Sequence, residues 1–148
     1  LVEVTGGEPL FQKECIDLLK ELTKHKYEVM LETGGSLSIN NVPKEVIKIV
    51  DFKCPSSGME KKNLWKIVDD LQPHDEIKFV IGDRYDFDWA KNKIKQYNLN
   101  KKCLILMSPT FGAIEPKNIV QWILNDNLPV RMQLQMHKLI WAPETKGV

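Results

Sequence analysis

Short apolar runs alternate along the chain with stretches in which apolar residues recur at helical spacing, and one such pair occupies about 25 residues. This alternation is typical of βα units, which build a parallel sheet. The sequence therefore predicts an α/β fold. No shift in composition divides residues 1–148, so we interpret them as a single domain.

Strands are expected over the runs Leu1–Val4, Tyr27–Leu31, Asp51–Lys53, Ile77–Ile81, Cys103–Met107 and Val130–Met136. Helices are expected over 11–22, 43–50, 63–71, 87–97 and 116–124. Pro43 and Pro116 fit a first helical turn, where a missing N–H costs nothing, and Asn63 fits a helix N-cap. The first helix is expected to bury a stripe made of Phe11, Cys15, Leu18, Leu19 and Leu22.

The last predicted strand separates its side chains by polarity. One face carries Arg131, Gln133, Gln135 and His137, and the other carries Val130, Met132, Leu134 and Met136. The polar face fits a sheet edge that faces solvent. It fits equally the interior of a partly open barrel, where a ligand satisfies the polar groups.

Polar loops follow most of the predicted strands, and they read Thr5–Pro9, Glu32–Ser36, Lys53–Gly58, Ser108–Thr110 and His137–Lys138. A single loop of this kind usually only turns the chain. Because ligands bind where the carboxyl ends of parallel strands converge, the set as a whole predicts a binding site there.

Composition narrows the possible partners. The formal net charge is +1 and no polybasic run is present, so neither nucleic acid nor anionic lipid is an expected partner. No apolar stretch approaches the ~20 residues that span a bilayer, and the start lacks a signal-peptide pattern. We therefore expect a cytoplasmic protein.

The three cysteines, Cys15, Cys54 and Cys103, are odd in number and far apart, which favours reduced thiols over disulfides or a zinc site. Leu1 is not a methionine, and the chain opens inside an apparent strand. We therefore expect that a further segment precedes it.

Motifs along the whole chain carry a resemblance to a known family. Thr5–Pro9 resembles the GGE motif of radical S-adenosylmethionine (SAM) enzymes. Three further strings, Glu32–Ser36, Asp51–Met59 and Gln133–Trp141, together with the ending Lys146–Val148, are similar to the 7-carboxy-7-deazaguanine synthase family. The resemblance implies a partial (β/α) barrel of the radical SAM type.

The resemblance also implies an activity. It is the lyase reaction that contracts 6-carboxy-5,6,7,8-tetrahydropterin to 7-carboxy-7-deazaguanine with loss of ammonia, in queuosine biosynthesis. The implied cofactors are SAM, a 4Fe–4S cluster and Mg²⁺, and the implied electron donor is a flavodoxin or ferredoxin. Members of the family are typically homodimers.

Site residues follow from the motif matches. Gly6, Gly7 and Glu8 are expected to bind SAM, the last through its ammonium group. Lys53 and Ser56 are expected at the SAM carboxylate and ribose, and Ser57 is left open as an alternative to Ser56.

The implied substrate-binding residues are Thr5, Glu32, Ser108, His137 and Val148. A carboxylate at position 32 suits the adjacent N–H donors on the aminopyrimidinone edge of a pterin. The histidine is expected near the pterin carboxylate, and the serine stands where relatives have a longer glutamine.

The chain departs from the family pattern in one respect. The CxxxCxxC-type loop that holds the cluster, the threonine that binds magnesium and the first barrel strand are all missing. We therefore expect no metal site in this chain and no turnover by it alone. Two alternatives stay open: another radical SAM enzyme such as a glycyl-radical activase, and a non-catalytic fragment that binds a nucleoside or pterin.

Overall fold

The computed structural model describes residues 1–142 and Thr145. Its centre is a six-stranded sheet in which every pairing is parallel and the strands follow one another in sequence order. The strands are β1 Val2–Val4, β2 Val29–Thr33, β3 Ile47–Phe52, β4 Glu76–Ile81, β5 Leu104–Pro109 and β6 Arg131–Met132. Sequential parallel order is the order of strands in a (β/α) barrel, and here the sheet stays open.

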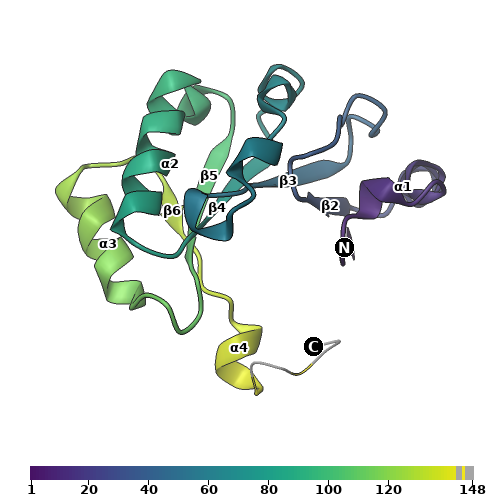
Figure 1. Ribbon diagram of the computed structural model, residues 1–148. Coiled ribbons are helices and arrows are strands. Elements are labelled where there is room, and N and C mark those ends of the chain that lie inside the picture. Colours follow the sequence, from purple (N-terminus) through teal and green to yellow (C-terminus); the bar gives the residue numbers. More distant parts are fainter. Residues whose placement is uncertain (143–144, 146–148) are drawn as a thin grey trace.

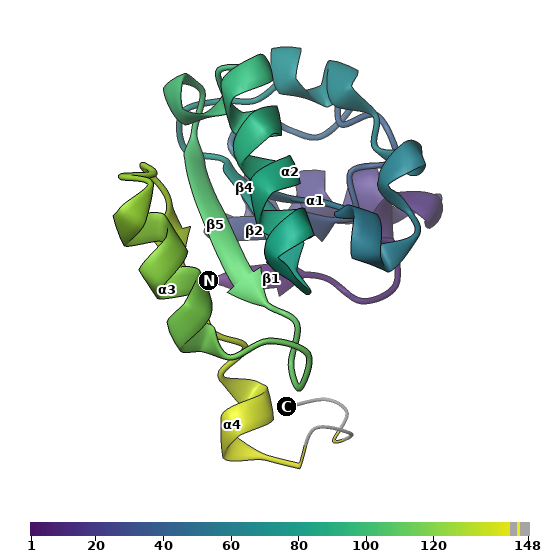
Figure 2. The same ribbon diagram turned by 60° about the vertical axis from the view of Figure 1, so that its left-hand side comes forward.

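Helices cover one face of the sheet. The α-helices are α1 Cys15–Lys24, α2 Arg84–Gln96, α3 Pro116–Asn125 and α4 His137–Ile140. Short 3₁₀ helices lie at Pro9–Phe11, Pro55–Ser57, Glu60–Lys62, Trp65–Asp69 and Leu99–Lys101. Figures 1 and 2 show α1, α2 and α3 around the outside of the curved sheet, while α4 lies apart, beyond the carboxyl end of β5. None of the helices in the described part of the chain has the length and apolarity to cross a membrane.

The two faces of the sheet differ in chemistry because side chains alternate along each strand. Leu31, Val50, Phe79 and Met107 point into one core with residues of α1, α2 and α3. Their neighbours along the strands point to the opposite face, which no helix among the described residues covers. The uncovered face is concave, and at the carboxyl ends of the strands its residues are polar.

The expected helix over 43–50 is wrong, because residues from Ile47 onward form β3. Val46, Ile47, Ile49 and Val50 are β-branched, which disfavours a helix and suits a pleated strand. The proline signal at Pro43 marks only a turn, in which the Val46 N–H bonds to the Pro43 carbonyl at 3.1 Å.

The expected helix over 63–71 is reduced to a 3₁₀ turn at Trp65–Asp69. Asn63 does not cap it. Its side chain bonds instead to the backbone N–H and carbonyl of Lys53, both at 2.9 Å. Trp65 stacks between Phe52 and Tyr97, with ring centroids 4.5 and 4.6 Å away. Tertiary contacts therefore override the helical spacing of this segment.

Two other expectations are corrected. The stripe on the first helix is only partly buried: Cys15 and Leu19 lie in the core, but Phe11 is 70% exposed and Leu18 is 49% exposed. The strand expected over 130–136 ends at Met132, so His137 begins a helix instead of closing a strand face. The strand expected over Asp51–Lys53 begins four residues earlier, at Ile47, and β1, β2, β4 and β5 have both ends within two residues of their expected positions.

The two adjacent leucines of α1 provide a test of the packing. We expect Leu19→Ala to lower the free energy of unfolding by about 2–5 kcal/mol, because it leaves a cavity in the core. Leu18→Ala, the matched control in the same helix, is expected to cost less than about 1 kcal/mol. Urea unfolding followed by circular dichroism measures both, and similar losses would contradict the assignment of the helix face.

Candidate functional site

The residues predicted from the motifs lie at the carboxyl ends of β1, β2, β3 and β5 and at the start of α4. They form two neighbouring groups. One surrounds Glu8 and Lys53, and the other surrounds Glu32. Val148, also expected to bind substrate, lies outside the described residues.

Glu8 is fixed by the end of β2. Its carboxylate accepts the Thr33 hydroxyl at 2.8 and 2.9 Å, the Gly34 N–H at 2.7 Å and the Leu10 N–H at 3.2 Å. These bonds join the loop after β1 to the loop after β2. The carboxylate is therefore held in one direction before any ligand arrives, which lowers the entropy cost of binding.

Gly6 and Gly7 form the turn that leads to Glu8. Their φ angles are 92° and 55°, a region in which side chains other than glycine are strained. A Cβ atom added to either would meet nothing within 4 Å, and both residues are exposed. Within the part of the chain that the structure describes, no atom from outside this turn lies close to its Cα hydrogens.

Lys53 reaches the same place from the end of β3. Its ammonium group pairs with Asp51 Oδ2 at 2.6 Å, while Asn63 holds its backbone. Gly34 lies between the two groups, since a Cβ on it would be 3.2 Å from Glu8 Oε2 and 3.9 Å from Lys53 Cε. The structure thus brings Glu8 and Lys53 together.

Ser56 is anchored by a carboxylate that sequence reasoning missed. Asp86, fully buried at the start of α2, accepts the Ser56 N–H at 2.9 Å, the Ser56 hydroxyl and the Gly82 N–H at 2.8 Å. Ser57, the alternative, donates its hydroxyl to the Cys54 carbonyl at 2.6 Å and closes the turn. Ser56 is therefore joined to the loop after β4, whereas Ser57 is bonded within its own loop.

Glu32 lies on the concave face of the sheet. Its Oε1 accepts the Lys78 ammonium at 2.7 Å, and its Oε2 accepts the Thr5 hydroxyl at 3.1 Å. Burial alone would favour the neutral acid, but the hydrogen bond and charge of Lys78 and the Thr5 hydroxyl outweigh it and lower the pKa of Glu32. Glu32 is therefore an ionised acceptor near neutral pH.

A pocket of about 320 Å³ brings three of the predicted substrate residues together, while Thr5 does not line it and bonds to Glu32. Glu32, Ser108 and His137 all line it, with Lys78 and the segment 133–136. Glu32 and His137 thus converge although they are 105 positions apart in sequence (137 − 32). Ser108 is 1% exposed, and its hydroxyl has no hydrogen-bond partner among the described residues.

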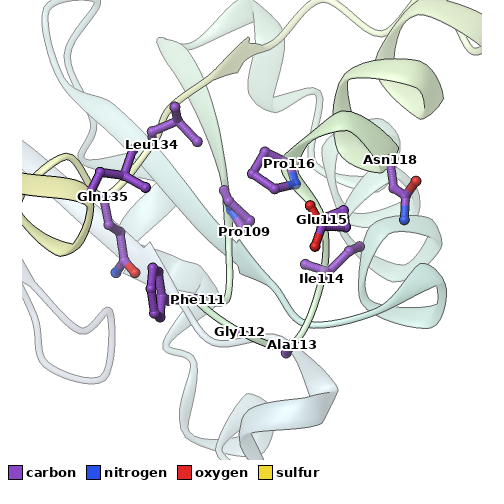
Figure 3. Close-up of a pocket in the computed structure, with 11 residues that line it drawn as sticks. Pro109, Phe111, Gly112, Ala113, Ile114, Glu115, Pro116, Asn118, Leu134 and Gln135 are labelled. Atoms are coloured by element: carbon purple, nitrogen blue, oxygen red, sulfur yellow. The ribbon is translucent and has the colours of Figure 1, made fainter. Parts of the chain in front are cut away.

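Figure 3 shows a second pocket, of about 510 Å³, between the loop after β5 and the segment that precedes α4. Its lining is mainly apolar and includes Pro109, Phe111, Ile114 and Leu134. Among the residues that the structure describes, none of the predicted SAM-binding or substrate-binding residues lines it. It adjoins the pocket around Glu32, with which it shares Leu134 and Gln135.

Lys78 and Asp51 are further members of the site that the sequence interpretation did not select. They are neighbours in the register between β3 and β4 and point to the concave face. Glu76 and Lys78 alternate with the buried Ile77 and Phe79, and this alternation could have indicated the direction of Lys78. Asp51 Oδ1 is buried without a partner in the described residues, and burial raises the Asp51 pKa despite the opposing effect of Lys53.

The described residues do not fit an iron–sulfur cluster. Cys15 lies in α1, Cys54 follows the carboxyl end of β3, and Cys103 precedes the amino end of β5, so the last two are at opposite ends of the sheet. Burial raises the pKa of all three thiols, that of Cys103 to about 12. Within residues 1–142 and 145, no three His, Cys, Asp or Glu side chains gather closely enough to hold a metal ion.

Asp86 provides a test of how the Ser56 loop is held. We expect Asp86→Asn to lower the free energy of unfolding by about 1–3 kcal/mol, because an amide cannot accept from all three donors. Asp88→Asn, two positions on in the same helix and half exposed, should cost about 0–1 kcal/mol. Urea unfolding measures both, and the amide NMR shifts of Ser56 and Gly82 should change only in the first variant. Unchanged shifts would show that Asp86 does not hold this loop.

Several known proteins are similar to this chain in amino-acid sequence. The 7-carboxy-7-deazaguanine synthase of Koribacter versatilis is 44% identical over 162 aligned residues, covering 100% of this chain and 72% of the relative. That of Chlorobaculum tepidum is 43% identical and covers 99% of this chain and 68% of the relative. That of Methanospirillum hungatei is 40% identical, and the chain spans 58% of its length. No protein-family model matches the chain.

The fold also has a counterpart among solved structures. The crystal structure of QueE from Escherichia coli superposes with a TM-score of 0.69 at 20% identity, over 90% of this chain and 55% of that chain. This similarity confirms the expected partial barrel. Given its identity to curated relatives over essentially its whole length, the chain belongs to the 7-carboxy-7-deazaguanine synthase family.

Proposed function

We propose that this chain carries the SAM and substrate sites of an enzyme that contracts 6-carboxy-5,6,7,8-tetrahydropterin to 7-carboxy-7-deazaguanine with loss of ammonia, a step of queuosine biosynthesis. The observation that carries the proposal is the shared pocket of Glu32, Ser108 and His137, next to the Glu8 and Lys53 group. Relatives that align with this chain bear the name of the synthase.

The Glu8 group suits the amino-acid end of SAM. Glu8 offers a fixed carboxylate to an ammonium group, Lys53 offers a cation to a carboxylate, and Gly6–Gly7 leave open space beside them. Ser56, whose hydroxyl donates to Asp86, can still accept a bond from a ribose hydroxyl. When bound and cleaved by one electron from a reduced cluster, SAM would supply the radical that begins the reaction, and the residues of this chain would position it.

The Glu32 pocket suits a pterin. A carboxylate accepts about four hydrogen bonds, and Lys78 and Thr5 use two, so room remains for the adjacent N–H donors of an aminopyrimidinone. Ser108, which lacks a partner, can bond to the ring directly or through water. His137 can place an N–H on the substrate carboxylate from the other side of the pocket.

Several finer properties belong to the same proposal. The reaction is a carbon–nitrogen lyase reaction, it uses Mg²⁺ and an external electron donor such as a flavodoxin or ferredoxin, and the enzyme is a cytoplasmic homodimer. Because the described cysteines do not fit a cluster, we propose that residues outside this sequence hold it. The 148-residue chain alone is then inactive.

Glu8 is tested through SAM binding. We expect Glu8→Gln to weaken binding about tenfold or more, since a neutral amide attracts the SAM ammonium less than a carboxylate does. Glu14→Gln, an exposed glutamate six positions later, should bind like the wild type. Equilibrium dialysis with radiolabelled SAM measures all three proteins. Equal affinities would remove Glu8 from the site.

The activity is tested by reconstitution. The complete gene product, treated anaerobically with iron and sulfide, should hold a cluster and form 7-carboxy-7-deazaguanine from carboxytetrahydropterin and SAM. The 148-residue chain, treated identically, should retain no stoichiometric iron. Iron analysis, visible absorption and chromatography of products measure these outcomes. A cluster-loaded complete protein that leaves the pterin unchanged would reject the proposed reaction.

A further inference from the structure

Lys78 is the cation on the concave face that the motif matches do not assign. It projects from β4 and is largely buried, with 17% of its side chain exposed, and its ammonium lies 2.7 Å from Glu32 Oε1 on β2. Strand β3 lies between these two strands. The side chain therefore spans one intervening strand to reach Glu32.

The surroundings of Lys78 define its partner. Asp51 is the neighbour of Lys78 in the register between β3 and β4. Its Oδ2 forms an ion pair with Lys53 Nζ at 2.6 Å. Glu32 is thus the acid that Lys78 contacts, although the charges of Lys78 and Lys53 each act on both Glu32 and Asp51. Removing Lys78 would leave the partly buried Glu32 with only the Thr5 hydroxyl and the more distant charge of Lys53.

We propose that Lys78 is a positioning residue for the substrate site: it holds the Glu32 carboxylate ionised and turned so that its free lone pairs face the pocket. This inference rests on the proposed function, in which Glu32 accepts the aminopyrimidinone edge. Lys78 occupies Oε1 and Thr5 occupies Oε2, so the carboxylate is fixed from both sides. Two acceptor positions remain, which match the number of adjacent N–H donors on a pterin.

The proposal has a consequence for pH. Glu32 must be ionised to accept both donors, so binding is lost as pH falls through the Glu32 pKa. Lys78 keeps that pKa low, and without it burial favours the neutral acid and moves the loss of binding to higher pH. The other charged or titratable groups nearby are Asp51, Lys53 and His137. The charge of Lys78 also lowers the Asp51 pKa, so a substitution at position 78 changes Asp51 as well, and the Glu32 pKa has to be measured on Glu32 itself.

The test measures binding of 6-carboxypterin, a stable fluorescent relative of the substrate, to the complete gene product over a pH range that starts below the lowered Glu32 pKa and ends near neutral pH. We expect Lys78→Met to weaken binding about tenfold or more near neutral pH and to shift the midpoint of the pH profile upward. Lys78→Arg, which keeps the charge, should stay within about threefold of the wild type. Lys102→Met is the control, because it removes the same charge from an exposed lysine near the amino end of β5.

A second measurement separates positioning from a general structural role. Carboxyl ¹³C NMR should show a higher Glu32 pKa in Lys78→Met than in the wild type and in Lys102→Met. In a Glu32→Gln background, Lys78→Met should have no further effect on binding, because Lys78 acts through Glu32. Should Lys78→Met fail to fold, Lys78→Gln serves in the same comparisons.

The outcomes distinguish this inference from the proposed function. A wild-type chain that binds no 6-carboxypterin at any pH would count against the substrate assignment itself. A wild type that binds, with Lys78→Met matching Lys102→Met in affinity and midpoint, would overturn the role of Lys78 alone. An upward shift in both the binding midpoint and the Glu32 pKa supports it.

Discussion

The register between parallel strands is the constraint on which the site depends. Once Phe52 faces the helices, Asp51 must face the concave side, and pairing of β3 with β4 then places Lys78 beside it. A slip of one residue would turn these charges into the apolar core and the core side chains into the pocket. The hydrophobic layer thus fixes the positions of the polar groups on the other face.

Loops above the sheet are held by polar side chains that bond to their backbone, two of them from a neighbouring βα unit and one, Asn63, from the same connection. Glu8 bonds to Gly34 across the first two units, Asn63 holds Lys53, and Asp86 holds Ser56. Each uses backbone N–H groups as donors, so the loop conformation is set by few residues. A site made of separate loops can in this way be shaped before a ligand arrives.

Sequence periodicity predicted the strands well because the apolar half of each strand is buried under helices. It failed at 43–50, where a helix signal from Pro43 competed with a run of β-branched residues that the sheet required. Leu18 and Phe11 were predicted to be buried but are exposed. Periodicity indicates which side of a helix is apolar, but it does not indicate how much of that side the sheet covers. The last strand was overextended for a similar reason, since its alternation continues after pairing with β5 ends.

The motif residues of the candidate site were found from resemblance, and the structure brings Glu32, Ser108 and His137 to one pocket. Their individual roles stay predictions. Lys78 and Asp86 were missed because each acts through a partner distant in sequence, and only the three-dimensional arrangement reveals that partner. The oxygens of the buried Asp86 carboxylate accept N–H groups of another loop, and no pattern in the neighbouring sequence indicates such a contact.

The residues Gly82, Ser56 and Asp86 constrain one another, because Asp86 bonds to the other two. A Cβ at position 82 would lie 2.8 Å from Ser56 Oγ and 3.2 Å from Asp86 Oδ2. The serine could avoid it only by turning away and giving up its bond to Asp86. Homologues that replace the glycine should therefore also have changed the serine or the aspartate, so these three positions should vary together or not at all.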